Sequence, residues 1–249
     1  MTLIAGPADA PAIVFVHGTR LTGSMWTAQV DALSDEFRTI ALDLPAHGTR
    51  AGEPFTIEAA AEALSATIVE HGRGRAVVVG LSLGGYIAMA LAAREPERVR
   101  ALVLSGATAE PVGIRMLPYL ALASVMGGVS DARLDRLNTR FFRRRYPAAI
   151  AEPIVAGGFW SRGGASALRA ISGERFVPRL AAYPGPTLII NGELDLPFRL
   201  FARSFTSAAG DVRRVRLAGA THLANLDRPA AFNEAVRRFV RSLEAETGG

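Results

Sequence analysis

Residues 75–94, RAVVVGLSLGGYIAMALAAR, decide the fold of this chain. Residues 76–79 form a β-branched apolar run typical of a buried strand, and residues 84–94 form an alanine-rich stretch that favours a helix. Ser82 lies between them in a G-x-S-x-G pattern, which lets a strand turn sharply into a helix and leaves the serine hydroxyl exposed above the sheet edge. We therefore predict that Ser82 is a nucleophile. The alternative is a glycine-rich turn whose serine only caps the helix.

The composition limits the class of protein. The chain has 249 residues and no cysteine, which suits one large domain and excludes disulfides, cysteine-bound zinc and a cysteine nucleophile. The sequence begins without a basic segment followed by an apolar one, and no apolar run approaches the ~18 residues of a membrane span. We therefore expect a cytoplasmic protein, monomeric or homo-oligomeric, that does not associate with membranes.

The positive charge of the chain is local. The net charge is +5, and all 28 basic residues are arginines. Residues 108–180 contain 11 arginines against 5 acidic residues, whereas the remaining segments together are close to neutral. A regional excess of this kind argues against nucleic acid as a partner, and a solvated surface is its simplest explanation.

Predicted strands and helices alternate along most of the chain. This alternation is typical of an α/β fold with a mostly parallel sheet covered by helices on both faces. The predicted strands span residues 13–16, 38–42, 76–79, 101–104, 187–191 and 212–217, and the predicted helices span residues 25–33, 57–70, 84–94, 197–209 and 229–244.

The alternation stops between residues 108 and 180. This segment has no short β-branched strand, but residues 114–126 and 132–146 have the spacing of helices. We therefore predict a core domain made of residues 1–107 and 181–249, with residues 108–180 inserted as a helical cap, or lid.

A serine hydroxyl reacts only beside a base, usually a histidine that a carboxylate orients. When the serine stands on a strand-to-helix turn of this kind, the acid and then the histidine follow it in the chain. His222 is the only one of the four histidines that follows Ser82, and the sequence GATHLANL places it directly after the last predicted strand. It therefore lies at the same sheet edge as the serine, and we predict that it is the base.

Several carboxylates between the serine and the histidine are candidates for the acid. Asp195, in the sequence NGELD, follows the strand predicted over residues 187–191 and lies at the edge where ligand-facing loops gather. We predict that Asp195 is the acid. Glu110, which follows an earlier strand, and Glu193, in the same loop, stay open as alternatives.

An acyl-transfer site also needs hydrogen-bond donors for the negative charge that develops on the substrate oxygen. The predicted donors are the backbone N–H of Leu83, at the start of the helix, and that of Thr19, just after His17 and Gly18. His17 and His47 precede the serine and are expected to brace loops by hydrogen bonds. Neither a metal nor an organic cofactor is required.

With the stretches HGTRLTGSMW, DLPAHG, GLSLGG, NGELD and GATHLANLDRPAAFNEAVRRFV, the chain resembles the α/β-hydrolase superfamily. The matching stretches run through nearly the whole chain apart from residues 108–180. Within the superfamily, the sequence looks like small esterases and enol-lactone hydrolases. The resemblance implies a cap over the pocket and a leading strand that is missing or reduced to residues 2–4. It also implies a triad and two oxyanion donors: Ser82, Asp195 and His222, with Thr19 and Leu83.

We therefore predict a serine hydrolase that cleaves carboxylic esters or lactones through an acyl-enzyme intermediate. One alternative uses the same triad for carbon–carbon bond hydrolysis or peracid formation. Carbon–carbon bond hydrolases often carry asparagine where this chain has Leu81, which counts against that activity. The other alternative is a ligand receptor that keeps the hydrolase fold but turns over slowly.

The cap is expected to select the substrate. An arginine facing the pocket would favour a substrate with a carboxylate, through bidentate pairing. The candidates for this role are Arg143, Arg144, Arg145 and Arg162. Apolar residues of the cap either line the pocket or, as helical spacing more often indicates, pack between cap and core. They are Met116, Leu117, Tyr119, Met126, Phe159 and Trp160.

Overall fold

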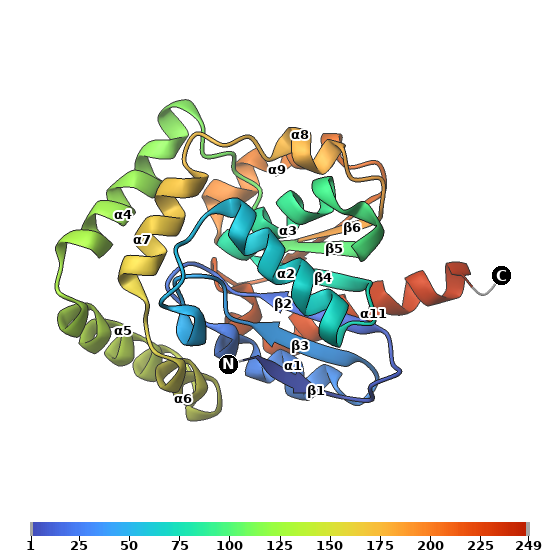
Figure 1. Cartoon of the computed structure of the whole chain (residues 1–249), viewed down its shortest axis with the longest axis horizontal. Helices are drawn as coiled ribbons and strands as arrows, with labels where there is room; N and C mark the ends of the chain where they lie inside the picture. Colours follow the sequence, from blue (N-terminus) through green and yellow to red (C-terminus); the bar gives the residue numbers. More distant parts are fainter. Residues whose placement is uncertain (1, 248–249) are drawn as a thin grey trace.

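The structure, a computed structural model, describes residues 2–247, with side chains through Ala245. Across these residues, seven strands form one sheet in the order β1-β3-β2-β4-β5-β6-β7 (Figure 1). Only β1 runs antiparallel to its neighbour, so the predicted α/β fold with a mostly parallel sheet is confirmed. The strands are β1 (Leu3–Ala5), β2 (Ala12–Val16), β3 (Arg38–Leu42), β4 (Ala76–Leu81), β5 (Val99–Ser105), β6 (Thr187–Gly192) and β7 (Val212–Leu217).

The central strands are apolar along their whole length because both faces of the sheet are covered. Successive side chains of a strand point to opposite faces. In β2, Val14 and Val16 therefore pack against α2 (Ile57–His71) and α3 (Leu83–Arg94), while Ile13 and Phe15 pack against α1 (Thr27–Leu33) and α11 (Pro229–Thr247). All four of these β2 side chains are fully buried. The short β1 agrees with the expectation of a reduced leading strand.

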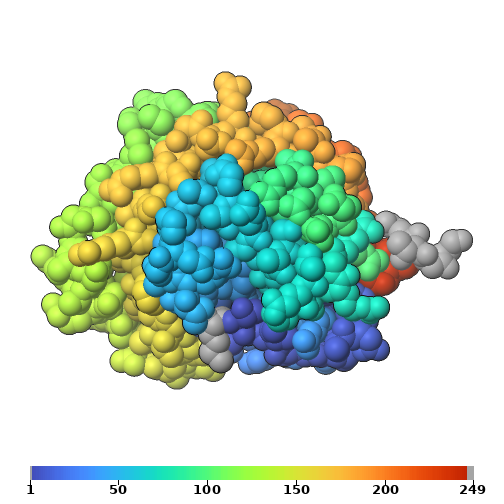
Figure 2. Space-filling view, in the orientation of Figure 1, coloured from blue at the N-terminus to red at the C-terminus, as the bar shows by residue number. Residues whose placement is uncertain are grey.

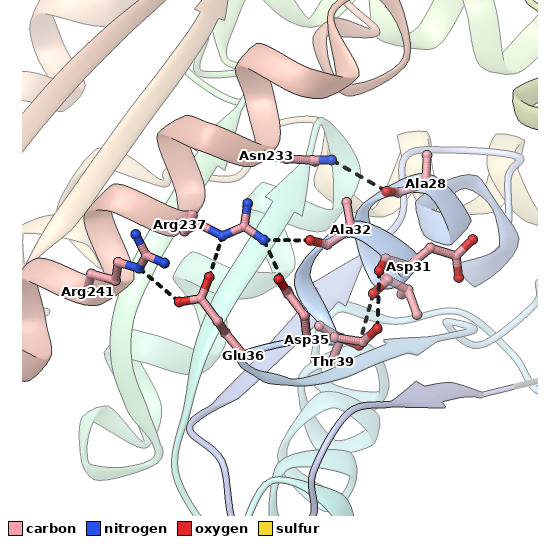
Figure 3. A network of polar contacts seen from close by, with 11 residues as sticks. Ala28, Asp31, Ala32, Asp35, Glu36, Thr39, Asn233, Arg237 and Arg241 are labelled. Atoms are coloured by element: carbon pink, nitrogen blue, oxygen red, sulfur yellow. Dashed lines mark hydrogen bonds and ion pairs between the residues drawn. The ribbon is translucent and has the colours of Figure 1, made fainter.

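Charged side chains fasten α11 to the segment between α1 and β3 (Figure 3). The Arg237 guanidinium bonds Glu36 at 2.6 Å and Asp35 at 3.0 Å, and Arg241 bonds Glu36 at 2.8 Å. Nearby, the Asn233 amide donates to the carbonyl oxygen of Ala28. The C-terminal helix is thus held against the sheet face that α1 also covers.

The chain between β5 and β6 contains helices and no strand among its described residues. Helices α4 (Leu117–Gly128) and α7 (Ser161–Ile171) lie side by side, next to α5 (Asp131–Arg145) and α6 (Ala148–Gly157). These helices form one end of the molecule, at the left of Figure 2, and α8 (Val177–Ala181) leads back to the sheet. Helical periodicity predicted α4 and α5 but missed α6, α7 and α8, which contain proline, glycine pairs or only five residues.

The remaining helices follow the last strands. They are α9 (Leu196–Ala208), after β6, and α10 (Ala224–Asp227), after β7. No helix within residues 2–247 is both long and apolar enough to cross a lipid bilayer.

Candidate active site

Ser82 occupies the single residue between β4 and α3. Its backbone has φ 52° and ψ −116°, in the positive-φ region that residues with a side chain rarely adopt. Such a conformation costs about 1–3 kcal/mol and persists only when the surroundings enforce it. The Ser82 N–H is held at 2.8 Å by the carbonyl oxygen of Ser105, at the end of the neighbouring strand β5. The sharp turn expected from the sequence is therefore present.

The two glycines of the motif are needed for close backbone contacts. A Cβ atom on Gly80 would lie 2.5 Å from the carbonyl carbon of Gly84. A Cβ atom on Gly84 would overlap the carbonyl oxygen of Val16 in β2. No side chain could move to relieve either overlap, because the opposing atoms belong to the backbone. The helix can therefore start this close to the sheet only with glycine at both positions.

His222 and Asp195 meet at the same edge of the sheet. His222 lies in the loop between β7 and α10, and its Nδ1 is 2.9 Å from Oδ2 of Asp195, which directly precedes α9. The Asp195 side chain is 6 % exposed, whereas that of His222 is 35 % exposed. A buried carboxylate thus orients an imidazole whose other side remains accessible, and the ring of Phe198 packs against it at 4.7 Å.

The two alternative carboxylates have other partners. Glu110 accepts hydrogen bonds from the N–H groups of Phe176 and Val177, at 2.9 and 2.7 Å, and so caps the start of α8. Glu193 accepts a hydrogen bond from the N–H of Gly219 at 3.0 Å. The carboxylate that contacts His222 is therefore that of Asp195.

Two residues that sequence reasoning missed position the His222 loop. Gly106 has φ +56°, and a Cβ atom there would lie 2.8 Å from the imidazole Nδ1 and Cε1 of His222. Asp227 accepts hydrogen bonds from the Thr221 N–H at 2.7 Å and from the Tyr146 hydroxyl at 3.0 Å. In the sequence, Asp227 could have been noticed because it follows His222 by five residues. For Gly106, the sequence offers only the fact that it follows a predicted strand.

The proposed oxyanion donors lie on either side of Ser82. Leu83 is the first residue of α3, where a backbone N–H has no carbonyl partner within the helix. Thr19 lines the same cavity as Ser82, and its side chain donates to the carbonyl oxygen of Gly164. The preceding Gly18 lies so close to the turn that a Cβ atom on it would be 3.8 Å from that of Ser82.

His17 and His47 brace the loops around the site, as expected. His17 Nδ1 donates to the Gly18 carbonyl, and its Nε2 accepts the Leu44 N–H, both at 2.9 Å. Burial and the neighbouring His47 lower the pKa of His17 to about 3, and burial lowers that of His47 to about 4. Both rings are therefore neutral at physiological pH and serve as hydrogen-bond bridges.

Ser82 and His222 line one cavity of about 480 Å³. The cavity lies between the carboxyl edge of the sheet and the helices that follow β5, and its walls are mostly apolar. The apolar wall comes from α4, α5, α7 and α9, through Pro118, Leu122, Phe142, Leu168, Phe198 and Phe201 among others.

The structure decides which of the candidate residues between β5 and β6 line the cavity. Of the six apolar candidates, only Tyr119 lines this cavity, while Met126 and Phe159 are buried in packing. None of the four candidate arginines lines it. Three of them form ion pairs elsewhere: Arg143 with Glu152, Arg145 with Asp227 and Arg162 with Asp131.

The direction in which the α5 side chains point explains why its three arginines do not line the cavity. The C-terminal turn of α5 buries Phe142 and leaves Arg143, Arg144 and Arg145 exposed. The arginines of the cavity are instead Arg20 and Arg115. Arg20 belongs to the loop after β2, which the sequence interpretation used only for its backbone donor.

Residues 13–235 match the model of the alpha/beta hydrolase family. The chain belongs to this family. The match runs from β2 into the first turns of α11 and thus includes the Ser82 turn, Asp195 and His222. Fold and family are as expected from the sequence.

Other alpha/beta hydrolases are similar over nearly the whole chain. A 3-oxoadipate enol-lactonase of Acinetobacter baylyi is 26 % identical over 97 % of this chain and 92 % of its own length. A carboxylesterase of Bacillus subtilis is 27 % identical over 96 % of this chain and 83 % of its own length. The crystal structure of an enol-lactonase from Burkholderia xenovorans superposes with a TM-score of 0.82, at 28 % identity, covering 97 % of this chain and 96 % of that one.

Proposed function

We propose that this alpha/beta hydrolase cleaves carboxylic esters or lactones through an acyl-enzyme formed on Ser82. The observation that carries the proposal is the His222–Asp195 pair, with 2.9 Å between Nδ1 and Oδ2, in the cavity that Ser82 also lines. A base oriented by a buried carboxylate, beside a serine on a strained turn, is the arrangement that activates a hydroxyl nucleophile.

In the proposed reaction, His222 takes the Ser82 proton as Oγ attacks the carbonyl carbon of the substrate. The negative charge that develops on the carbonyl oxygen is stabilised by the N–H groups of Thr19 and Leu83. His222 then protonates the leaving alkoxide, and Asp195 stabilises the charged imidazole. A water molecule that His222 deprotonates then attacks the acyl-enzyme; the bond to Ser82 Oγ breaks, His222 returns the proton to that oxygen, and the acid is released. For a lactone, alcohol and acid remain parts of one product.

We further propose that residues 108–180 act as a lid on a core formed by residues 1–107 and 181–249. The support is that α4, α5 and α7 supply much of the cavity wall opposite Ser82. An apolar cavity of this kind suits the hydrocarbon part of an ester and keeps bulk water from the reacting atoms.

The general class of the activity follows from the relatives, whose names are enol-lactonase, methyl ester esterase and carboxylesterase. The chain is a carboxylic ester hydrolase. The sequence also allowed carbon–carbon bond hydrolysis, peracid formation and a slow-turnover receptor for the same three residues, and analysis of products and turnover tests these alternatives.

The test is hydrolysis of p-nitrophenyl esters of graded acyl length, followed by burst kinetics. We expect Ser82→Ala to lower kcat/KM by at least about 10³-fold. The matched control is Ser34→Ala at the end of α1, whose hydroxyl bonds the Asp31 carbonyl and lies away from the cavity. A one-equivalent burst without turnover would favour the receptor, and unchanged turnover in Ser82→Ala would refute the serine mechanism.

A further inference from the structure

The cavity that contains Ser82 and His222 has positive charges and no carboxylate on its wall. Arg20 and Arg115 are among its lining residues, and within the described part of the chain no aspartate or glutamate lines it. The rest of the wall is mostly apolar. An anionic group that enters the cavity therefore meets two guanidinium groups and no repelling carboxylate.

Among the described residues, Arg20 is partly buried and has no side-chain partner, whereas other arginines without a side-chain partner, such as Arg133, Arg144 and Arg214, are exposed. Arg237 pairs with Glu36 at 2.6 Å and Arg98 with Glu95 at 2.7 Å. Arg115 lies over the ring of Phe201, 5.0 Å from its centre. Within residues 2–247, the Arg20 guanidinium forms no ion pair, side-chain hydrogen bond or ring contact, although the residue is partly buried.

An unpaired cation in such a place is unfavourable. Burial lowers the pKa of Arg20, but a guanidinium keeps its proton at neutral pH. A desolvated charge without a counterion destabilises the folded protein, and a negatively charged ligand that binds there removes this penalty. Among the side chains that the structure describes, none supplies a negative charge to pair with the Arg20 guanidinium.

The backbone of Arg20 is held firmly despite an unfavourable conformation. Its φ is 59°, in the left-handed region that favours glycine and asparagine. Its N–H donates to Nε2 of His47 at 3.3 Å, and its carbonyl accepts the N–H of Trp160 at 2.8 Å. These bonds fix the start of the side chain one residue, or about 3.8 Å along the chain, from the proposed oxyanion donor Thr19.

We propose that Arg20 is the anion-binding residue of the substrate cavity, and that the enzyme acts on esters or lactones that carry a carboxylate a few bonds from the scissile carbonyl. This inference rests on the proposed function, because it assumes that the reacting carbonyl lies between Ser82 and Thr19. The planar guanidinium binds a carboxylate through two parallel hydrogen bonds, which fixes the orientation of the substrate as well as its affinity.

The experiment compares methyl hydrogen adipate with methyl hexanoate, a neutral ester of the same acyl length. Hydrolysis is followed by alkali uptake at constant pH, and the quantity compared is the ratio of kcat/KM for the anionic ester to that for the neutral one. We expect Arg20→Met to lower this ratio by about 10- to 100-fold, the range for the loss of a charge-assisted hydrogen-bond pair. Arg20→Lys keeps the positive charge but cannot form two parallel hydrogen bonds to a carboxylate, and it should give an intermediate ratio.

Arg143→Met is the matched control, because it removes the same charge from an exposed residue outside the cavity. Its ratio should equal that of the wild type. Arg115→Met tests the second arginine of the cavity. If Arg115→Met lowers the ratio and Arg20→Met does not, or if both esters lose activity equally in Arg20→Met, the assignment to Arg20 is overturned. Thermal unfolding of each variant shows whether it is folded.

Binding separates this inference from the proposed function. Calorimetry of methyl hydrogen adipate with Ser82→Ala measures affinity without turnover, and adding Arg20→Met should weaken the Kd about 10- to 100-fold. Arg20-dependent binding without wild-type hydrolysis would refute the hydrolase mechanism and support the anion site. Hydrolysis that depends on Ser82, with a ratio of kcat/KM values that does not depend on Arg20, would support the hydrolase mechanism and refute the anion site.

Discussion

Two buried histidines, His17 and His47, should make the free energy of unfolding depend on pH. The dependence should extend to pH values above those at which carboxylates titrate. His17 and His47 have ring centres 5.0 Å apart, and both are completely buried. Burial is the main cause that lowers their pKa values to about 3 and about 4, and the Asp43 carboxylate opposes this only partly. The unfolded chain binds protons at both rings below pH ~6.5, whereas the folded chain does not.

The sign and size of the effect follow from proton linkage. Because the folded-state pKa values are depressed, the stabilisation is complete above pH ~6.5 and is lost as the pH falls through that value toward about 4 and then about 3. Between pH 7 and pH 5, each histidine should lower the free energy of unfolding by about 2 kcal/mol. The pair then removes about 4 kcal/mol, a large part of the 5–15 kcal/mol typical of a domain.

Urea unfolding followed by circular dichroism at intervals from pH 8 to pH 5 measures this dependence. Near pH 5, the free energy of unfolding should fall by about 2 to 3 kcal/mol per pH unit, equivalent to nearly two protons. His17→Gln and His47→Gln should each remove about half of this slope, whatever they do to stability at pH 8. A wild-type free energy that stays constant from pH 7 to pH 5, or a slope that both variants retain, would refute the assignment of the two buried neutral rings.

Two further changes test the arrangement around the imidazole. Asp195→Asn should lower kcat by several orders of magnitude with little change in melting temperature, because the imidazole loses the charge that holds its reactive tautomer. Glu110→Gln should leave kcat within about twofold and destabilise the protein by about 1 kcal/mol, since Glu110 caps α8. Equal losses of kcat in the two variants would contradict this division of roles. Gly106→Ala should lower kcat by at least about tenfold and should also lower the melting temperature, because the new Cβ would lie 2.8 Å from the His222 ring and φ at this position is +56°. Full activity in a stable variant would show that residue 106 does not confine the His222 ring.

The questions that sequence reasoning left open concern contacts between distant segments. The position of Glu110 after a strand made it a candidate acid, and only folding brings the N–H groups of Phe176 and Val177 to it, 66 and 67 residues further on. Gly106 gave no local signal, because its importance depends on where the loop of His222 comes to lie. The arginines of α5 were candidates for the pocket wall, and the phase of the helix turns them to solvent.

The sequence by itself determined the alternation of strands and helices, the Ser82 turn, and the order in which Asp195 and His222 follow. These features depend on local periodicity, on glycine at close backbone contacts, and on the rule that parallel strands end at one edge. Only the tertiary structure decided which carboxylate meets the histidine and which arginine lines the cavity. Both outcomes depend on the distance and orientation of side chains from separate elements, and no local pattern encodes those quantities.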